Sequence, residues 1–105
     1  MSKRLEAIQK MLAAGNRDAF TLYAFAMELK GLERYAESLT AFEQLRTADP
    51  AYVAQYLMAG GVAEALGNKD DARAWYEQGI ERARAKGDSH ALSEIQTALD
   101  TLGAR

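Results

Sequence analysis

Apolar residues recur along the chain at intervals of three and four positions, the spacing that gathers side chains on one face of an α-helix. Leu5, Ile8 and Met11 begin this pattern, and Ile95 and Leu99 continue it near the other end of the chain. Gly, Asn and Asp residues interrupt it at points that suit helix ends. The pattern predicts six helices, at about residues 3–14, 19–30, 35–48, 50–66, 69–86 and 89–102, and no strands.

Residues that can cap a helix mark several of these boundaries. A side-chain oxygen just before a helix can accept a hydrogen bond from its first turn. The candidate caps are Ser2, Asp18, Asn68 and Asp88. Pro50 is unable to continue one helix but suits the first position of the next. We therefore expect the fourth helix to begin at Pro50, with Asp49 as its N-cap.

The middle of the chain contains an internal repeat. The plan of residues 19–50 returns in residues 53–84, shifted by 34 positions. The tripeptide Phe-Glu-Gln that begins at Phe42 returns as Tyr-Glu-Gln at Tyr76. Small residues stand where two helices must cross closely, and aromatic ones where the space must be filled. The small residues are Ala26, Ser38, Gly60 and Ala72.

This period and pattern resemble the tetratricopeptide repeat (TPR), a helix-turn-helix unit of 34 residues. The family pattern places an aromatic residue, Leu-Gly and Tyr in the first helix, Ala and Phe in the second, and then Pro. Two positions depart from it, because Glu33 stands where a turn glycine is usual and Arg84 replaces the second closing proline. The matching residues are Leu22, Phe25, Ala26, Leu29, Ser38, Phe42 and Pro50 in the first unit, and Tyr56, Ala59, Gly60, Ala63, Ala72 and Tyr76 in the second.

The resemblance implies an all-α fold, a short right-handed α-solenoid of antiparallel helix pairs with about six helices. We expect a single TPR-like domain over residues 1–105, and the polar outer faces of its end helices suit caps that close a solenoid. With Met1, these caps favour a small stand-alone TPR protein of bacterial type. The predicted parts are an N-terminal capping helix (1–17), repeat 1 (18–50), repeat 2 (51–87) and a C-terminal capping helix (88–105).

Composition and charge narrow the functional classes. With 49% hydrophobic and 27% charged residues, the chain is globular rather than disordered. The absence of cysteine removes disulfides, zinc–thiolate sites and thiol catalysis, and it fits a reducing compartment, so we expect a cytoplasmic protein. A net charge of −2 gives no reason to expect nucleic acid or a membrane surface as partner. The first residues are too polar for a signal peptide, and no apolar run approaches membrane-spanning length.

No set of residues indicates a reaction. His90 is the only histidine, and its place near a helix start favours a solvated or packing role over that of a base. Asp70 with Asp71, and Glu33 with Glu37, are carboxylates expected on solvated helix faces. The glycine pair in the fourth helix lacks the lysine pattern of a phosphate-binding loop. We therefore expect no catalytic, cofactor-binding or metal-ligating residue, and no enzyme.

What the resemblance implies is binding. TPR-like proteins generally hold an extended or helical peptide on the concave face, which the first helix of each unit lines. A subset holds a terminal carboxylate with Lys, Asn and Arg, but Tyr23, Met27 and Met58 stand at such positions here, so we do not expect this clamp. Met and aromatic residues suit an amphipathic helix or an apolar peptide instead. The predicted groove residues are Phe20, Tyr23, Met27, Lys30, Leu57, Met58, Gly61 and Glu64.

Alternatives stay open at this point. The leading hypothesis is a non-catalytic adaptor that binds a protein or peptide in this groove. The second is a structural role by self-association, because the same apolar residues can pack on the end helices or on a second copy in a homodimer. The third is an enzyme or its regulatory domain. Gly61 likewise has two interpretations, tolerated drift or the close approach of a neighbouring helix or a ligand.

Overall fold

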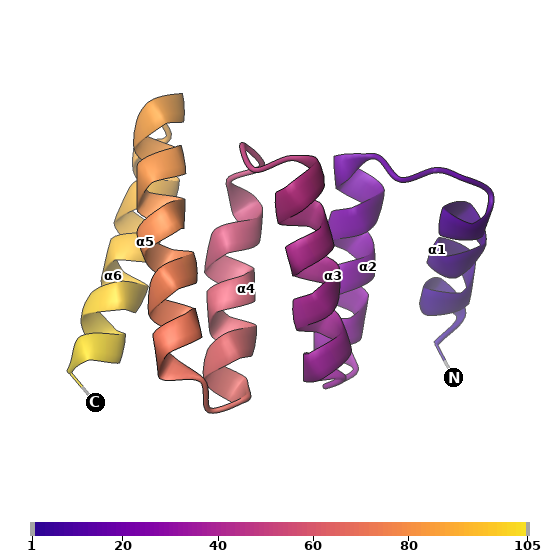
Figure 1. The fold of residues 1–105 in the computed structure, drawn as a ribbon, viewed down its shortest axis with the longest axis horizontal. Coiled ribbons are helices and arrows are strands. Elements are labelled where there is room, and N and C mark those ends of the chain that lie inside the picture. Colours follow the sequence, from indigo (N-terminus) through magenta and orange to yellow (C-terminus); the bar gives the residue numbers. More distant parts are fainter. Residues whose placement is uncertain (1, 105) are drawn as a thin grey trace.

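The computed structural model describes residues 2–104 and holds six helices in that range: α1 (Lys3–Ala13), α2 (Ala19–Gly31), α3 (Tyr35–Ala48), α4 (Ala54–Ala65), α5 (Lys69–Lys86) and α6 (Ser89–Gly103). The described residues contain no β-strand. Successive helices run antiparallel and stand side by side in a row (Figure 1). This architecture confirms the predicted all-α fold, a short solenoid of helix pairs.

The helices form two layers. Each helix packs on the next one in the chain, and α4 also contacts both α2 and α6. Helices α2, α4 and α6 therefore share one layer, the inner layer, and α1, α3 and α5 make up the outer layer. In Figure 1, α3 and α5 stand in front of α2 and α6. With extents of 40 × 29 × 19 Å, the molecule is a slab two helices thick.

The four predicted helix caps are confirmed. Each side-chain oxygen accepts a hydrogen bond from the backbone N–H three residues further on, at 2.7–3.1 Å. Hydrogen bonds from Thr21 lower the pKa of the Asp18 carboxyl group. The bond from the Thr21 backbone has the larger effect and the bond from its side chain the smaller. The caps are Ser2, Asp18, Asn68 and Asp88.

The start of α4 differs from the prediction that Asp49 caps a helix beginning at Pro50. The helix begins at Ala54, after a turn. Two buried side chains of α4 hold this turn, because the Gln55 amide donates to the carbonyl of Asp49 at 2.9 Å and the Tyr56 hydroxyl donates to that of Pro50. In a helix that began at Pro50, its carbonyl would accept a backbone N–H four residues on. In the structure the Tyr56 hydroxyl takes the place of that N–H.

The turn between α2 and α3 has the left-handed backbone that is usual for glycine, although the residue at this position is Glu33. Glu33 adopts a left-handed conformation (φ 60°), as does Gly67 (φ 77°) 34 positions later. Left-handed backbone is unfavourable for residues with a Cβ. The first repeat therefore keeps the turn of the second and accepts some strain at Glu33.

The second repeat achieves its close helix crossing with two glycines. A Cβ on Gly60 would clash with the Tyr76 ring, and a Cβ on Gly79 would lie 2.5 Å from the Cβ of Tyr56. Both aromatic residues are buried. This confirms the prediction that Gly60 is small for a packing reason.

One core runs through all six helices and crosses the boundary between the repeats. At that boundary Trp75 of α5 is fully buried, and the guanidinium group of Arg46 from α3 lies 3.9 Å from the centre of its ring. The predicted apolar face of the first helix, Leu5, Ile8, Met11 and Leu12, is confirmed except at Met11. Leu5 and Ile8 are buried and Leu12 packs on the core, whereas Met11 is 42% exposed. Helix α1 contacts only α2, so only one narrow side of α1 is covered.

Candidate peptide-binding groove

The inner layer is hollowed where α2 and the first turns of α4 and α6 meet. A cavity of about 300 Å³ lies there, at the lower end of the range of ligand sites. Its floor is apolar, with contributions from all three helices of the layer. The lining residues are Tyr23, Val53, Ala54, Leu57, Met58, Asp88, His90, Ala91, Glu94 and Ile95.

Two other rings fix Tyr23 in the wall of this cavity. Its ring centroid lies 5.2 Å from that of Tyr52 and 6.3 Å from that of Phe42, the latter edge-on. Burial raises the pKa of the Tyr23 hydroxyl, and the neighbouring Tyr52 adds to the effect. The phenol therefore stays protonated at neutral pH and can donate a hydrogen bond to a group in the cavity.

At the start of α6 one side of the cavity is polar and acidic, next to the apolar Ala91 and Ile95. One carboxylate oxygen of Asp88 accepts the backbone N–H of Ala91 at 3.0 Å. Nε2 of His90 lies 3.1 Å from Oε1 of Glu94, one turn further on, and the Glu94 side chain is half exposed. Among the described residues that line the cavity there is no Lys or Arg.

Three of the eight predicted groove residues meet at this cavity: Tyr23, Leu57 and Met58. All three are half-buried. Met27 also lies in the inner layer and packs against the core. A Cβ on Gly61 would meet no atom within 4 Å, so the idea that Gly61 admits a neighbouring helix is wrong. Gly61 adjoins open space.

The other three predicted residues are not part of the cavity lining. Phe20 lies in the first turn of α2 and is 71% exposed. Lys30 lies in the last turn of α2 and is half-buried. Glu64 accepts a hydrogen bond from the Tyr76 hydroxyl, which ties α4 to α5. All three lie near helix ends, away from the cavity. Counting positions within the repeat did not separate them from the residues that line it.

The sequence prediction missed the contribution of α6. It treated this helix as a closing cap, whereas Ala91 and Ile95 of α6 line the cavity beside Leu57. The signal was present, because counting one more period from Leu57 and Gly61 gives Ala91 and Ile95. The third inner helix therefore continues the groove of the first two.

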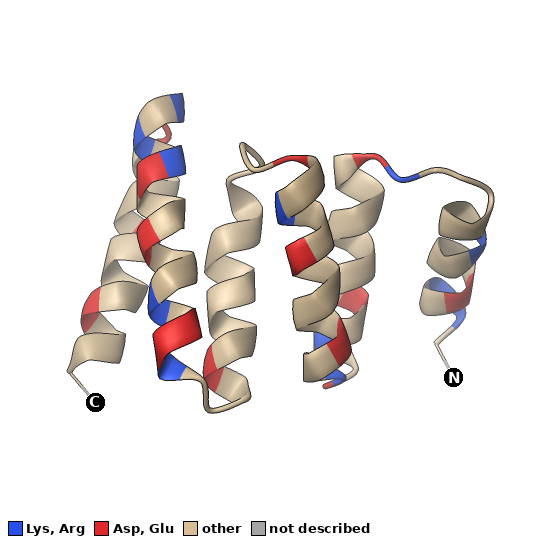
Figure 2. Cartoon of the chain, viewed as in Figure 1, with Lys and Arg blue, Asp and Glu red and all other residues tan. Residues whose placement is uncertain are grey.

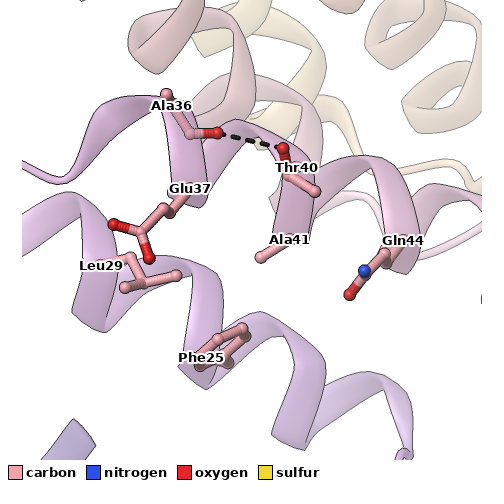
Figure 3. Close-up of a pocket in the computed structure, with 7 residues that line it drawn as sticks. All are labelled: Phe25, Leu29, Ala36, Glu37, Thr40, Ala41 and Gln44. Atoms are coloured by element: carbon pink, nitrogen blue, oxygen red, sulfur yellow. Dashed lines mark hydrogen bonds between the residues drawn. The ribbon is translucent and has the colours of Figure 1, made fainter.

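A second hollow of about 350 Å³ lies between α2 and α3. Figure 3 shows Phe25 and Leu29 on α2 below Ala41 on α3. Ala41 stands 34 positions before Trp75, so the first repeat has a methyl group where the second has a buried indole. The complete lining is Phe25, Leu29, Ala36, Glu37, Thr40, Ala41 and Gln44.

Neither hollow contains a set of metal ligands. Over residues 2–104, no three His, Cys, Asp or Glu side chains come together in a way that could hold a metal ion. In the same part of the chain, no helix combines the length and hydropathy needed to cross a membrane. The cavity of the inner layer is lined by apolar, hydrogen-bonding and acidic side chains.

Comparison with known proteins agrees with the internal repeat. The family model described as tetratricopeptide repeat matches residues 56–86. TPR repeat-containing protein PA0015 of Pseudomonas aeruginosa is 31% identical over 101 residues, and the match covers 93% of each protein. The chain belongs to the tetratricopeptide repeat family. The resemblance drawn from the spacing of residues is thereby confirmed, and TPR proteins are generally non-catalytic interaction modules.

Solved structures share the architecture of this TPR chain. A TPR domain protein from Salinibacter ruber, solved in solution, is 41% identical with a TM-score of 0.78, and the match covers 82% of this chain and 87% of that one. The crystal structure of PcrH in complex with the chaperone binding region of PopD has a TM-score of 0.89. That match covers 96% of this chain and 77% of PcrH at 17% identity, so it shows the fold alone.

Proposed function

We propose that this TPR chain is a non-catalytic adaptor that holds an extended or helical segment of a partner protein in the groove of α2, α4 and α6. The observation that carries the proposal is the cavity in the inner layer, with its apolar floor and half-buried Tyr23, Leu57 and Met58. Apolar pockets with a few polar groups are the usual form of binding sites. A location in the cytoplasm stays a prediction.

The likeness to PcrH supports the proposal. PcrH was crystallised with a segment of another protein, and the two folds superpose over nearly all of this chain. A protein with this fold can thus bind a segment of another protein. The identity of the partner does not carry over.

The test compares two substitutions of leucines in and near α4. Leu57→Glu places a charge in the cavity, and we expect it to abolish binding of the partner. Leu66→Glu is the matched control, because Leu66 follows α4, is 43% exposed and is not among the cavity-lining residues. A partner captured from cell extract is identified, and its binding to each variant is measured by calorimetry. Equal binding of the partner to both variants contradicts the proposal. Tyr23→Ala is a second variant of the cavity, and the proposal is also contradicted if both Leu57→Glu and Tyr23→Ala unfold the protein, because the two side chains are then part of the core.

Self-association is the second candidate, favoured by the exposure of Phe20. A phenylalanine that is 71% exposed at the start of an inner helix is a suitable contact for a second copy. If this candidate is right, light scattering behind a sizing column gives the mass of a dimer, and Phe20→Ser gives that of a monomer. A monomer at every concentration rejects it.

A further inference from the structure

Charge is divided unevenly between the two layers. The inner helices α2, α4 and α6 carry four acidic residues and a single Lys or Arg, Lys30. With His90 counted as neutral, their net charge is −3. The outer helices α1, α3 and α5 together have a net charge of +2. Figure 2 shows charged residues along α1, α3 and α5, whereas α4 is uncharged over most of its length. The acidic residues of the inner helices are Glu28, Glu64, Glu94 and Asp100.

At the cavity itself the accessible charge is acidic. Glu28 is engaged by the Ser2 hydroxyl at 2.9 Å, with Arg4 at 3.6 Å, and Glu64 by Tyr76. Asp88 and Glu94 also have partners within α6, the Ala91 N–H and the His90 ring, but both line the cavity, and the Glu94 side chain is 50% exposed. An apolar floor thus lies directly beside two carboxylates.

We infer that the partner segment is a positively charged amphipathic one, with an apolar side chain in the cavity and a Lys or Arg beside Asp88 and Glu94. The inference rests on the proposed function, since it concerns the same groove. Complementary charge around an apolar contact sets specificity and the rate of association more than affinity. A negatively charged segment would meet the acidic side of the groove without compensation.

The experiment uses two fluorescein-labelled peptides of about 18 residues, roughly five helical turns. Both carry Leu at positions i, i+3, i+4 and i+7, and their polar positions are Lys in one peptide and Gln in the other. Fluorescence anisotropy measures the dissociation constant of each at low and high salt. We expect the Lys peptide to bind about three- to tenfold more tightly at low salt, with the difference shrinking at high salt.

Two double variants locate the effect. Asp88→Asn with Glu94→Gln removes two charges from the cavity and keeps the helix cap, because Asn caps as well as Asp. Glu77→Gln with Glu81→Gln removes two exposed charges from α5 in the outer layer. We expect the first variant to lose the preference for the Lys peptide and the second to keep it. Glu94→Gln alone, with the cap unchanged, should lose part of the preference.

The outcomes separate this inference from the proposed function. Equal binding of the two peptides, both sensitive to Leu57→Glu, overturns the inference and leaves the groove as the binding site. Equal loss of the preference in the two double variants shows attraction to the whole chain and also overturns it. Failure of both peptides to bind, or binding that ignores Leu57→Glu, contradicts the inference together with the proposed function.

Discussion

The two repeats build the same helix crossing from different residues. Where the second repeat has a larger side chain on one helix, it has a smaller one on the partner helix. Tyr56 faces Gly79, whereas the corresponding residues of the first repeat are Leu22 and Leu45. Similarly, Gly60 faces Tyr76 in the second repeat, at the positions of Ala26 and Phe42 in the first. The comparison teaches that a larger side chain on one helix is matched by a smaller one on its partner, so that the two helices can still cross closely.

The repeats also differ in what fills the space behind the crossing. In the second repeat Trp75 occupies it, 5.9 Å from the Tyr56 ring and under the guanidinium group of Arg46. In the first repeat Phe25 and Ala41 stand at the corresponding positions of Ala59 and Trp75, and a hollow remains. The first repeat is therefore the less completely packed of the two, beside the shortest helix, α1.

The largest effect is expected for removal of the indole. Trp75→Ala should lower the free energy of unfolding by about 3–5 kcal/mol, because it leaves a cavity in the core. Phe25→Ala should lower it by only about 1–2 kcal/mol, because Phe25 is half-buried beside a hollow. Urea unfolding followed by circular dichroism measures both. Equal losses would mean that the two repeats are equally packed, and Trp75→Phe serves if the alanine variant fails to fold.

The facing pairs should be coupled. Gly79→Leu introduces the residue of the first repeat without its partner, and we expect it to lower stability by about 1–3 kcal/mol through overpacking against Tyr56. Adding Tyr56→Leu should recover part of this loss, so the two changes will not be additive. The same unfolding measurement, applied to both single variants and the double variant, checks the coupling. Additive losses would show that the pair does not share one volume.

The hollow of the first repeat offers the converse test. Ala41→Trp in a Phe25→Ala background transplants the arrangement of the second repeat, and we expect it to recover about 1 kcal/mol of the loss caused by Phe25→Ala. Thermal unfolding measures the recovery. Thr47→Trp is the control, since Thr47 is exposed on α3 and does not line this hollow. A recovery of the same size at Thr47 would show that general surface burial, and not this space, is responsible.

The turns should respond in opposite directions. Glu33→Gly should raise the free energy of unfolding by about 0.5–1 kcal/mol, because glycine adopts φ 60° without a steric penalty. Gly67→Ala should lower it by about 1 kcal/mol for the same reason. Glu33→Ala separates the loss of charge from the change of backbone freedom. A Glu33→Gly variant no more stable than Glu33→Ala would contradict the strain at this turn.

The smallest effect concerns the helix caps and pH. The folded-state pKa of Asp18 is below its ordinary value because of the bonds from Thr21, so its contribution to stability is present above the unfolded-state pKa and is lost as pH falls through the folded-state pKa. Asn68, which caps α5, does not titrate in this way. Asp18→Asn should therefore lose less stability on acidification than the wild type does. Parallel acid profiles of unfolding would contradict this.

Local features of the fold followed from sequence, and features that depend on distant residues did not. The 34-residue period and the caps at Ser2, Asp18 and Asp88 predicted the helices, because a cap involves only residues of one turn. The start of α4 did not follow, because the buried Tyr56 and Gln55 reach back to the preceding carbonyls. The position at which α4 begins depends on which side chains are buried, and the presence of Pro50 in the sequence does not indicate that.

The candidate site was predictable to the extent that it repeats. Tyr23 and Leu57 were identified from their shared position in the unit, and the same count would have reached Ala91 on α6. The acidic side at Asp88 and Glu94 was not predictable in this way, because it belongs to a single helix. The hollow beside Ala41 was not predicted either, because it depends on how α2 and α3 pack on each other.

The junction of the repeats has a spectroscopic consequence. Trp75 is the only tryptophan in the chain, and it lies buried between α3 and α5 under Arg46. The protein thus contains a single tryptophan fluorophore, at the boundary where its two halves meet. Separation of the halves would expose the indole to water and shift its emission to longer wavelength, without any label. Because α1 does not contact α5, fraying of α1 would leave that emission unchanged.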